Sequence, residues 1–263
     1  MDTDAVLRLL QDVAEQVINP RFRDLADHEV DEKNPGDLVT AADREAEVLL
    51  TKALVAAYPD AVVLGEETFA GDPSLMTRYA EAQHAFTVDP VDGTKNFVEG
   101  KRDHAVMVGE VRGGEAVRGW IWQPQHGLAY VAEKGAGAFR NGERLDRPAP
   151  PEDPARWRGT TSRRRWLGRT LDGLDGLPPL ELTWVCCGVD YPKLLEGEAD
   201  FVLYGRANPW DHVPGSLLLA EAGAFVGTHD GTPYEPRLVT EGGLVAAADR
   251  TTYDAVVAAL AAS

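Results

Sequence analysis

Hydrophobic positions in the first 60 residues recur at the spacing of α-helices. Apolar side chains repeat every three or four positions at the start of the chain, which predicts an amphipathic helix over residues 3–18 that Pro20 closes. A second helix is expected to begin after Thr40, whose hydroxyl can cap the first amides, and to run to Pro59. Two helices are therefore expected before the first strand.

Two short apolar runs then end abruptly in acidic residues. The run "AVVLGEE" predicts a buried strand that delivers Glu66 and Glu67 at its carboxyl end. The run "AFTVDPVDG" repeats this design, with a strand over residues 85–88 followed by Asp89 and Asp92. The acidic side chains are therefore expected to gather at strand ends.

The remaining pattern predicts a layered α/β (α+β) protein with mixed strands. Apolar runs over residues 105–139 alternate with turn signals, as in an antiparallel meander. The stretch "RPAPPEDP" breaks the pattern, so we expect an N-terminal α+β subdomain over residues 1–146 and a C-terminal α/β subdomain over residues 155–263. The second half is expected to contain strands near residues 181–185 and 200–204, a helix around 192–196, a helix after Asp211, and a last strand and helix from Gly242.

Charge and composition narrow the choice of partners. The 263 residues include 43 acidic and 26 basic side chains, which give a formal charge of −17 and argue against binding of a nucleic-acid backbone. No apolar run approaches the roughly 20 residues of a membrane span, and the N-terminus lacks the basic region of a signal peptide. The adjacent Cys186 and Cys187 make a poor structural disulfide, so a reducing, cytoplasmic setting is expected.

The acidic residues at the strand ends would repel one another if they converged. The candidates are Glu66, Glu67, Asp89, Asp92 and the later Asp211. Like charges a few ångströms apart raise one another's pKa unless cations neutralise them. Ligands that are all oxygen, without histidine or thiolate, suit a hard cation such as Mg²⁺ or Mn²⁺. Convergence of these side chains therefore predicts a site for hard divalent cations.

The stretch "DPVDGTKNF", residues 89–97, adds the features of an anion site. Gly93 permits close approach of the backbone to a ligand, Thr94 supplies a hydroxyl, and a short helix that begins at either residue would direct its first amides at an anion. A surface turn is the alternative for this stretch alone. Its spacing differs from an EF-hand loop, which has acids at alternate positions, and from aspartyl-phosphate phosphatases, whose two aspartates are separated by one residue.

Four blocks in order resemble the inositol monophosphatase family of Mg²⁺-dependent, lithium-sensitive phosphatases. They are "DLVTAADREAE" from Asp37, "GEE" from Gly65, "DPVDGTKNF", and "PWDHVPGSLLLAEAGA" from Pro209. The resemblance covers nearly the whole chain. It implies a layered α-β-α-β-α sandwich of the inositol monophosphatase/fructose-1,6-bisphosphatase type, a small phosphorylated substrate, and a homodimer.

The resemblance also implies roles for individual residues. Thr94, oriented by Asp43, would help Glu66 to position and deprotonate a water molecule, while the amides of Gly93 and Thr94 hold the phosphate. Glu67 would lie just outside the metal ligands. Two or three Mg²⁺ ions, with Mn²⁺ as a possible substitute, would be held by the side chains of Glu66, Asp89, Asp92 and Asp211 and the carbonyl of Val91.

Residues expected to contact the rest of the substrate depart from the inositol-specific pattern. Those members carry a glutamate seven residues before the "WD" aspartate, where this chain has Tyr204, and Cys187 lies in the stretch that would line the sugar side of the pocket. Lys95 stands where inositol-specific members commonly have threonine, and a lysine at this position is similar to the pattern of histidinol-phosphate and nucleotide bisphosphate phosphatases. Its side chain either meets an extra anionic group of the substrate, or is solvated or paired with an acid. Arg206 and His212 flank the "NPWD" turn, as substrate contacts or as support.

Three functional hypotheses follow. The leading one is a Mg²⁺-dependent phosphomonoesterase that hydrolyses a small polyol or sugar-type phosphate, nominally inositol 1-phosphate, by direct attack of a metal-activated water. The closest rival is a histidinol-phosphate phosphatase, which Lys95 favours. The third is a catalytically idle family member that binds metal or phosphate. The arginine run between Arg156 and Arg169 is interpreted as a solvated face, with contact to a phosphorylated substrate or a dimer partner as the functional alternative.

Overall fold

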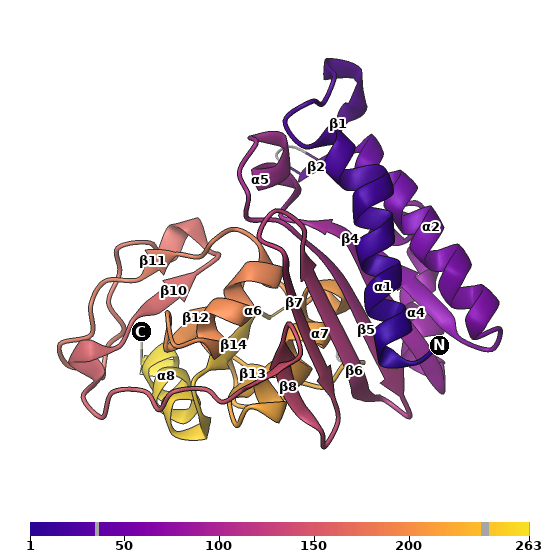
Figure 1. Ribbon diagram of the computed structural model, residues 1–263. Coiled ribbons are helices and arrows are strands. Elements are labelled where there is room, and N and C mark those ends of the chain that lie inside the picture. The colour runs from indigo at the N-terminus through magenta and orange to yellow at the C-terminus, as the bar shows by residue number, and fades with distance from the viewer. Residues whose placement is uncertain (35–36, 238–241, 263) are drawn as a thin grey trace.

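Five layers of helices and sheets make up the chain in the computed structural model, which describes residues 1–34, 37–237 and 242–262. Helices α1 and α2 cover one face of a seven-stranded sheet, α6 and α7 lie between this sheet and a five-stranded sheet, and α8 covers the outer face of the second sheet (Figure 1). This arrangement confirms the predicted α-β-α-β-α sandwich.

The first layer follows the predicted helices closely. Helix α1 (Thr3–Val13) is capped by the carboxylate of Asp2 and continues as one π-helical turn (Ala14–Ile18), so the expected helix over residues 3–18 is present with a wider last turn. Helix α2 (Ala41–Ala57) begins after Thr40, whose hydroxyl accepts hydrogen bonds from the first amides. The hairpin that precedes α2, formed by β1 (Val30–Asn34) and β2 (Asp37–Thr40), was not predicted.

The seven-stranded sheet contains its strands in chain order. The first two are parallel, and the others pair antiparallel, which confirms the meander. The fourth strand of the chain is longer than expected because "DPVD" forms its last residues. The strands are β3 (Val62–Gly65), β4 (His84–Asp92), β5 (Ala105–Arg112), β6 (Glu115–Gln123), β7 (Leu128–Glu133), β8 (Gly137–Arg140) and β9 (Glu143–Leu145), with α3 (Glu66–Gly71) and α4 (Ser74–Glu81) between β3 and β4.

The five-stranded sheet has the order β11-β10-β12-β14-β13. Its strands are β10 (Gly159–Thr161), β11 (Glu181–Leu182), β12 (Phe201–Leu203), β13 (Phe225–Thr228) and β14 (Leu244–Ala247). Strands β10 and β13 were not predicted, and β11 is shorter than the expected strand over residues 181–185. The helices are α6 (Cys187–Leu195), which begins five residues before the expected 192, α7 (Pro209–Glu221) and α8 (Arg250–Ala262).

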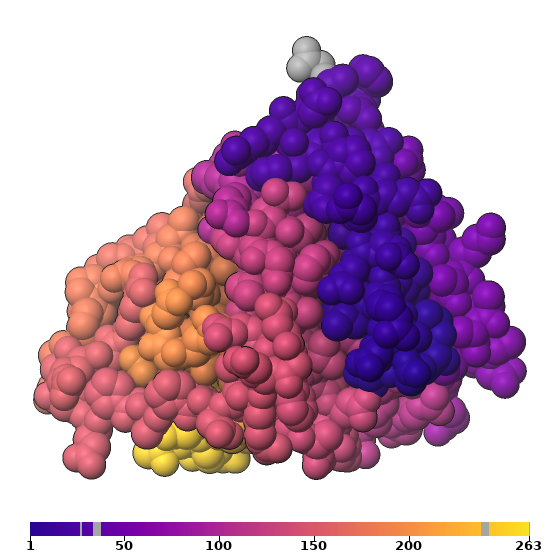
Figure 2. Space-filling model, viewed as in Figure 1, coloured from indigo at the N-terminus to yellow at the C-terminus, as the bar shows by residue number. Residues whose placement is uncertain are grey.

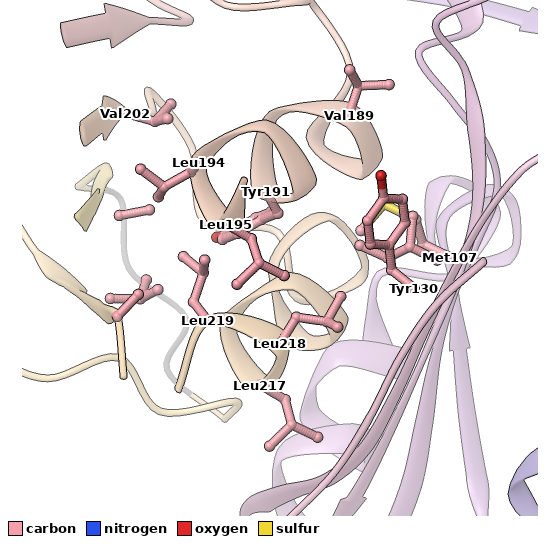
Figure 3. Close-up of a cluster of buried hydrophobic side chains, with 14 of the residues drawn as sticks. Met107, Tyr130, Val189, Tyr191, Leu194, Leu195, Val202, Leu217, Leu218 and Leu219 are labelled. Carbon is pink, nitrogen blue, oxygen red and sulfur yellow. The ribbon is translucent and has the colours of Figure 1, made fainter. Parts of the chain in front are cut away.

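The middle layer joins the two sheets into one core. Figure 3 shows Leu195 of α6 and Leu218 of α7 between Val202 of β12 and Met107 of β5, and all four side chains are almost fully buried. Burial of each such side chain contributes about 1.5–3 kcal/mol. Because α6 and α7 from the second half pack on the large sheet of the first half, the division at residues 147–154 stays a prediction.

The outer shape follows from this layering. The space-filling view shows the N-terminal segment and the C-terminal segment on opposite sides of the segment that forms the large sheet (Figure 2). Within the described ranges, none of the helices combines the length and the apolar character that crossing a membrane requires.

Candidate active site

Glu66 and Glu67 lie in the first turn of α3, directly after β3. The expected strand end is thus a strand-to-helix junction, where acidic side chains are favoured by the helix dipole. Glu47 of α2 caps this helix, because its buried carboxylate accepts the amides of Glu67 and Thr68, each at 2.7 Å. A Cβ on Gly65 would lie 2.3 Å from the carboxyl carbon of Glu47, so this position requires glycine.

The "DPVDG" segment places three site residues at the end of β4. The strand register with β5 shifts between Asp89 and Asp92, which is the geometry of a β-bulge next to a functional site. Gly93 then adopts a φ of +81° and precedes the short helix α5 (Thr94–Val98), as predicted. A Cβ on Gly93 would lie 3.0 Å from the Cβ of Cys186, so the turn needs glycine for both its conformation and its space.

The hydroxyl of Thr94 lies between two acceptors. It is 3.1 Å from Oδ1 of Asp43 and 3.0 Å from the carbonyl oxygen of Val91. The other carboxylate oxygen of Asp43 accepts the amide of Thr40 at 2.8 Å, so the Asp43 side chain is fixed. Burial raises the pKa of Asp43 to about 6, although the hydrogen bonds from Thr40 oppose the shift. The predicted pairing of Asp43 with Thr94 is therefore confirmed as a contact.

Asp89, Asp92 and Asp211 converge although they are far apart in sequence. Each offers a carboxylate oxygen, and these oxygens lie within 4.8 Å of one another. Asp211 comes from the first turn of α7, where the side chain of Asn208 donates a hydrogen bond to it at 3.1 Å. Burial and the neighbouring acids, Glu66 first among them, raise the pKa of Asp89 well above its usual range. The sheet end and the middle-layer helix thus bring three of the five predicted ligands together, and their role as ligands stays a prediction.

A hard divalent cation fits this cluster. The Oδ1 atom of Asp89 is buried and has no hydrogen-bond partner among the described residues. Burial also raises the pKa of Asp211 to about 7 and that of Glu66 to about 8. Carboxylates that resist ionisation at neutral pH indicate missing positive charge, and a donor set made only of oxygen suits Mg²⁺ or Mn²⁺.

Lys33 is the cation that sequence reasoning missed. Its ammonium nitrogen lies 2.6 Å from Oε1 of Glu66 and 2.9 Å from Oε1 of Glu67. Burial disfavours the charge of Lys33, but the two glutamates outweigh this effect and raise its pKa. The contact joins the β1–β2 hairpin to α3, and no spacing in the sequence signals it.

Cys186 and Gly188 hold the carboxylate of Asp92 from the start of α6. The Sγ atom of Cys186 lies 3.0 Å from Oδ2 of Asp92, and the amide of Gly188 donates to the same oxygen. A Cβ on Gly188 would lie 2.5 Å from that of Ala105 on β5, so glycine allows this helix end to approach the sheet. The sequence had singled out Cys187 instead, which lies beside the same site.

A pocket of about 1080 Å³ opens next to the carboxylate cluster. It brings together most of the residues expected to contact substrate: its walls include Lys95, Cys187, Tyr204, Arg206 and His212 together with Asp92 and Asp211. The buried hydroxyl of Tyr204 has no hydrogen-bond partner within the described part of the chain. The phenol therefore has an unused polar group in the pocket wall.

His212 supports the pocket from within the protein. Its Nδ1 atom lies 2.9 Å from the hydroxyl of Tyr191, and its Nε2 atom lies 3.0 Å from the carbonyl oxygen of Arg206. Burial lowers the pKa of His212 to about 4, so the ring is neutral at physiological pH. With both nitrogens occupied, His212 positions the loop before α7.

The arginine run divides into two parts. Arg163, Arg164 and Arg165 line the same pocket, and Arg164 and Arg165 are exposed there, so both the solvated face and the contact with a phosphorylated substrate stay open for these residues. They lie at a 3₁₀ turn (Arg164–Trp166) after β10, where a short strand returns the chain to the pocket. Arg158, in contrast, pairs with Glu181 at 2.8 Å on the surface.

The fold and the site define the chain as a phosphatase of the inositol monophosphatase type. The structure matches an inositol monophosphatase from Thermotoga maritima with a TM-score of 0.80 and 24% identity, covering 98% of this chain and 96% of that one. It also matches an IMPase/NADP phosphatase complexed with Mg²⁺ and phosphate, with a TM-score of 0.80, 20% identity, and coverage of 98% and 93%. The model of the inositol monophosphatase family matches residues 2–263, and the chain belongs to this family.

Curated relatives agree on the family and differ in their names. An inositol-1-monophosphatase of Mesorhizobium japonicum is 32% identical over 231 residues, 80% of this chain and 79% of the relative. A fructose-1,6-bisphosphatase/inositol-1-monophosphatase of Thermotoga maritima is 28% identical over 198 residues, 74% and 73% of the two chains. A putative Nus factor SuhB of Neisseria meningitidis is 25% identical over 217 residues, 74% and 75%. The chain is thus a phosphoric monoester hydrolase whose family covers several substrates.

Proposed function

We propose that this chain is a Mg²⁺-dependent phosphomonoesterase that acts on a small polyol or sugar-type phosphate, with inositol 1-phosphate as the nominal substrate. The observation that carries the proposal is the buried Oδ1 of Asp89, which lacks a partner among the described residues inside a cluster of carboxylates. Lys33 neutralises only the glutamate side of this cluster. The aspartate side needs a cation of its own.

The residues that would hold Mg²⁺ are those that resist ionisation or lack a partner. Bound Mg²⁺ would neutralise the acids, polarise the phosphate and lower the pKa of a water molecule; two or three ions are proposed, and Mn²⁺ suits the same donors. The ligands are Glu66, Asp89, Asp92 and Asp211, with the carbonyl of Val91. Glu67, paired with Lys33, lies outside the ligand set and helps to hold that lysine beside Glu66.

Thr94 and Asp43 position the attacking water. Thr94 donates its hydroxyl hydrogen to Asp43 or to the carbonyl of Val91, which leaves the lone pairs of its oxygen to accept a hydrogen bond from the water. Glu66 is the base that accepts the water's proton, since its carboxylate lies close enough to Asp89 and Asp211 to interact with both. The attack is direct, because Asp89 and Asp92 are separated by two residues and not by the single residue of the aspartyl-phosphate phosphatases.

The phosphate and the rest of the substrate occupy opposite ends of the pocket. The phosphate is assigned to the start of α5, at the amides of Gly93 and Thr94, and Lys95 follows these residues into the pocket wall. Tyr204 lies in the wall on the substrate side, and its buried hydroxyl lacks a hydrogen-bond partner among the described residues. Cys187 and Arg206 complete this side of the wall.

The rival substrate, histidinol phosphate, carries a protonated amine. Lys95 is present in the wall, as that hypothesis expects, but Arg163, Arg164, Arg165 and Arg206 lie there too. A wall with this many cations disfavours a cationic substrate. We therefore place histidinol phosphate behind polyol and sugar phosphates.

Release of inorganic phosphate from a substrate panel tests the function. The panel contains inositol 1-phosphate, histidinol phosphate, fructose 1,6-bisphosphate and adenosine 3′,5′-bisphosphate, each with Mg²⁺, with Mn²⁺ and with a chelator. Activity that needs the metal is expected, and Thr94→Val should lose at least about a hundredfold in kcat while Thr94→Ser retains most of it. If every substrate stays intact at saturating Mg²⁺, the idle-member hypothesis replaces this one.

Partner proposals follow from charge and family. The net charge of −17 argues against a nucleic-acid backbone as partner, although one relative is named a putative Nus factor. We propose a homodimer, and light scattering coupled to size-exclusion chromatography measures its mass. A monomeric mass across micromolar concentrations would remove the dimer from the proposal.

A further inference from the structure

One wall of the pocket is strongly basic although the chain as a whole is acidic. The formal net charge is −17. Yet the residues that line the pocket include six basic side chains, which we call the basic wall: Lys95, Lys101, Arg163, Arg164, Arg165 and Arg206. Among the acids that line the pocket, Asp92 and Asp211 belong to the carboxylate cluster, and Asp190 is buried and accepts the amide of Trp184 at 2.8 Å. A concentration of positive charge against this background requires an explanation at the pocket itself.

The acidic partners available to the basic wall are few. Glu99 is the remaining acid of the lining, and it pairs with Lys101 at 2.6 Å and lies 3.9 Å from Lys95. The four arginines form no ion pair within 4.0 Å with any carboxylate in the described ranges. Arg164 and Arg165 are exposed to the pocket, and Glu99 attracts Arg164 without forming an ion pair with it.

The arginines are held in place without acids. The guanidinium of Arg163 donates to the carbonyl of Gly205 at 3.0 Å and lies 5.0 Å from the ring centre of Trp166. The guanidinium of Arg165 lies 5.8 Å from the same ring. Burial lowers the pKa of Arg163, and Arg165 adds to this effect by repulsion. Aromatic packing and a backbone carbonyl thus keep like charges together, which is unfavourable unless an anion binds between them.

The basic wall and the carboxylate cluster belong to one continuous site. Lys95 directly follows Thr94, whose hydroxyl contacts Asp43. On the other side, Arg163 binds the carbonyl of Gly205, and the same loop continues through Arg206 into α7. The pocket of about 1080 Å³ matches the upper limit of ligand pockets, which span roughly 300–1,000 Å³, so a small monophosphate fills only part of it.

We propose that the pocket binds a phosphomonoester that carries a second phosphate group, which Arg163, Arg164 and Arg165 bind while the scissile phosphate lies at the carboxylate cluster. Arginine suits this role because its planar guanidinium forms paired hydrogen bonds to phosphate oxygens. The inference rests on the proposed function and narrows its substrates to bisphosphorylated sugars or nucleosides. Arg206 and Lys95 line the same pocket and compensate part of the charge that the second phosphate adds.

Matched substrate pairs test the second phosphate site. Fructose 1,6-bisphosphate is compared with fructose 1-phosphate, and adenosine 3′,5′-bisphosphate with adenosine 3′-monophosphate, so that the same ester is cleaved with and without a second phosphate. In at least one pair, kcat/KM should be about tenfold higher for the bisphosphate, mainly through KM. The double variant Arg164→Glu with Arg165→Glu should bring this ratio to about one or below. High salt should reduce the wild-type ratio, because ions screen exposed charges.

The chain offers a matched control for this experiment. Arg169 is an exposed arginine of the same run that does not line the pocket, so Arg169→Glu makes an equal charge change per site and should leave the ratio unchanged. Melting curves confirm that each variant is folded, and Arg164→Ala with Arg165→Ala serves if charge reversal disturbs folding. A wild-type ratio near one in both pairs, or a high ratio that survives the double variant, overturns the inference.

Failure of this inference is distinguishable from failure of the proposed function. If monophosphates and bisphosphates are hydrolysed equally, the phosphatase stands and the second site falls. If no phosphate is released from any substrate, the proposed function falls. Isothermal titration calorimetry with the same substrate pairs then tests the second phosphate site by binding alone. In that case about tenfold tighter binding of a bisphosphate, lost in the double variant, supports the anion site, and equal binding overturns it.

Discussion

Replacement of Asp89 by asparagine separates the electrostatic role of this side chain from its packing role. Asp89 is 2% exposed, and its Oδ1 atom has no partner among the described residues. Burial, Glu66, Asp92 and Asp211 all raise its pKa, so a negative charge at this position is unfavourable in the metal-free protein. An asparagine at this position would have nearly the same shape and no charge. The folded, metal-free protein should therefore be as stable as the wild type or more so.

The effect of Asp89→Asn on the melting temperature should become large when Mg²⁺ is added. A ligand at 100 times its dissociation constant stabilises a folded protein by about 2.7 kcal/mol. In a protein of this size each kcal/mol shifts the melting temperature by roughly 2–4 °C, so saturating Mg²⁺ should raise that of the wild type by roughly 5–10 °C. Asp89→Asn should lose most of this increase. Its phosphatase activity should fall by at least about a hundredfold, as expected for loss of a key electrostatic group.

Two measurements and one control decide the outcome. Differential scanning calorimetry with a chelator and with Mg²⁺ gives the metal-dependent shift, and phosphate release gives the rate. Asp60→Asn, an exposed aspartate in the turn before β3, makes the same chemical change away from the cluster and should alter neither quantity. A variant that keeps more than about a tenth of the wild-type rate, or that melts with the full Mg²⁺-dependent increase, would refute the assignment of Asp89 as a ligand.

Three further predictions concern the surroundings of the cluster. Lys33 neutralises Glu66 and Glu67 and thereby competes with a metal ion for the carboxylates. The variant Lys33→Met should therefore melt at a lower temperature than the wild type in chelator, but it should bind Mg²⁺ more tightly in activity titrations. An unchanged or weaker Mg²⁺ affinity would contradict this prediction. Gly65→Ala should cost about 1–3 kcal/mol in urea unfolding because its Cβ meets Glu47, whereas Gly71→Ala, with nothing within 4 Å, should cost under about 0.5 kcal/mol; equal costs would contradict the steric argument. His104 is fully buried, and burial lowers its pKa from 6.5 to about 4. Because the unfolded chain takes up this proton at a higher pH than the folded protein, the contribution of His104 to the free energy of unfolding is present above pH 6.5. It is lost as the pH falls toward 4, by about 1.4 kcal/mol per pH unit. His104→Phe should flatten that part of the pH profile in urea unfolding, and an identical profile would show that other groups cause it.

Much of the fold follows from periodicity, and the misses have physical reasons. Helices α1, α2 and α8 carry a regular apolar pattern because each has one face in a large core, whereas α7 and the first strand of the meander are buried almost throughout. Strands β10, β11 and β13 have two to four residues each, too few for an alternating pattern to be distinct. Strand β4 is longer than expected because a bulge accommodates Pro90, which normally ends a strand.

The residues of the candidate site also divide into those that the sequence predicted and those that it missed. Asp89, Asp92 and Asp211 were predicted because their chemistry is local: acidic residues at element ends in motifs with fixed spacing. Lys33 and Cys186 were missed because their roles depend on contacts across the fold, from a hairpin to a helix and from a helix to a strand end. Side chains that complete a site through tertiary packing leave no spacing in the sequence that could identify them.

The charge distribution of the protein connects the two ends of the pocket. A formal charge of −17 repels phosphorylated substrates at long range, but at physiological ionic strength charges farther away than about 8 Å are largely screened. Within that distance a substrate in the pocket meets the basic wall as well as Asp92 and Asp211 of the carboxylate cluster. The cluster alone repels phosphate, so the wall and the bound cations have to act together: Mg²⁺ makes the cluster attractive to the scissile group, and the arginines compensate the charge that remains on the rest of the substrate. A substrate without a second phosphate gains nothing from the basic wall. The ratio of kcat/KM between a bisphosphate and its matched monophosphate therefore reports on the basic wall, and the dependence of activity on Mg²⁺ reports on the carboxylate cluster.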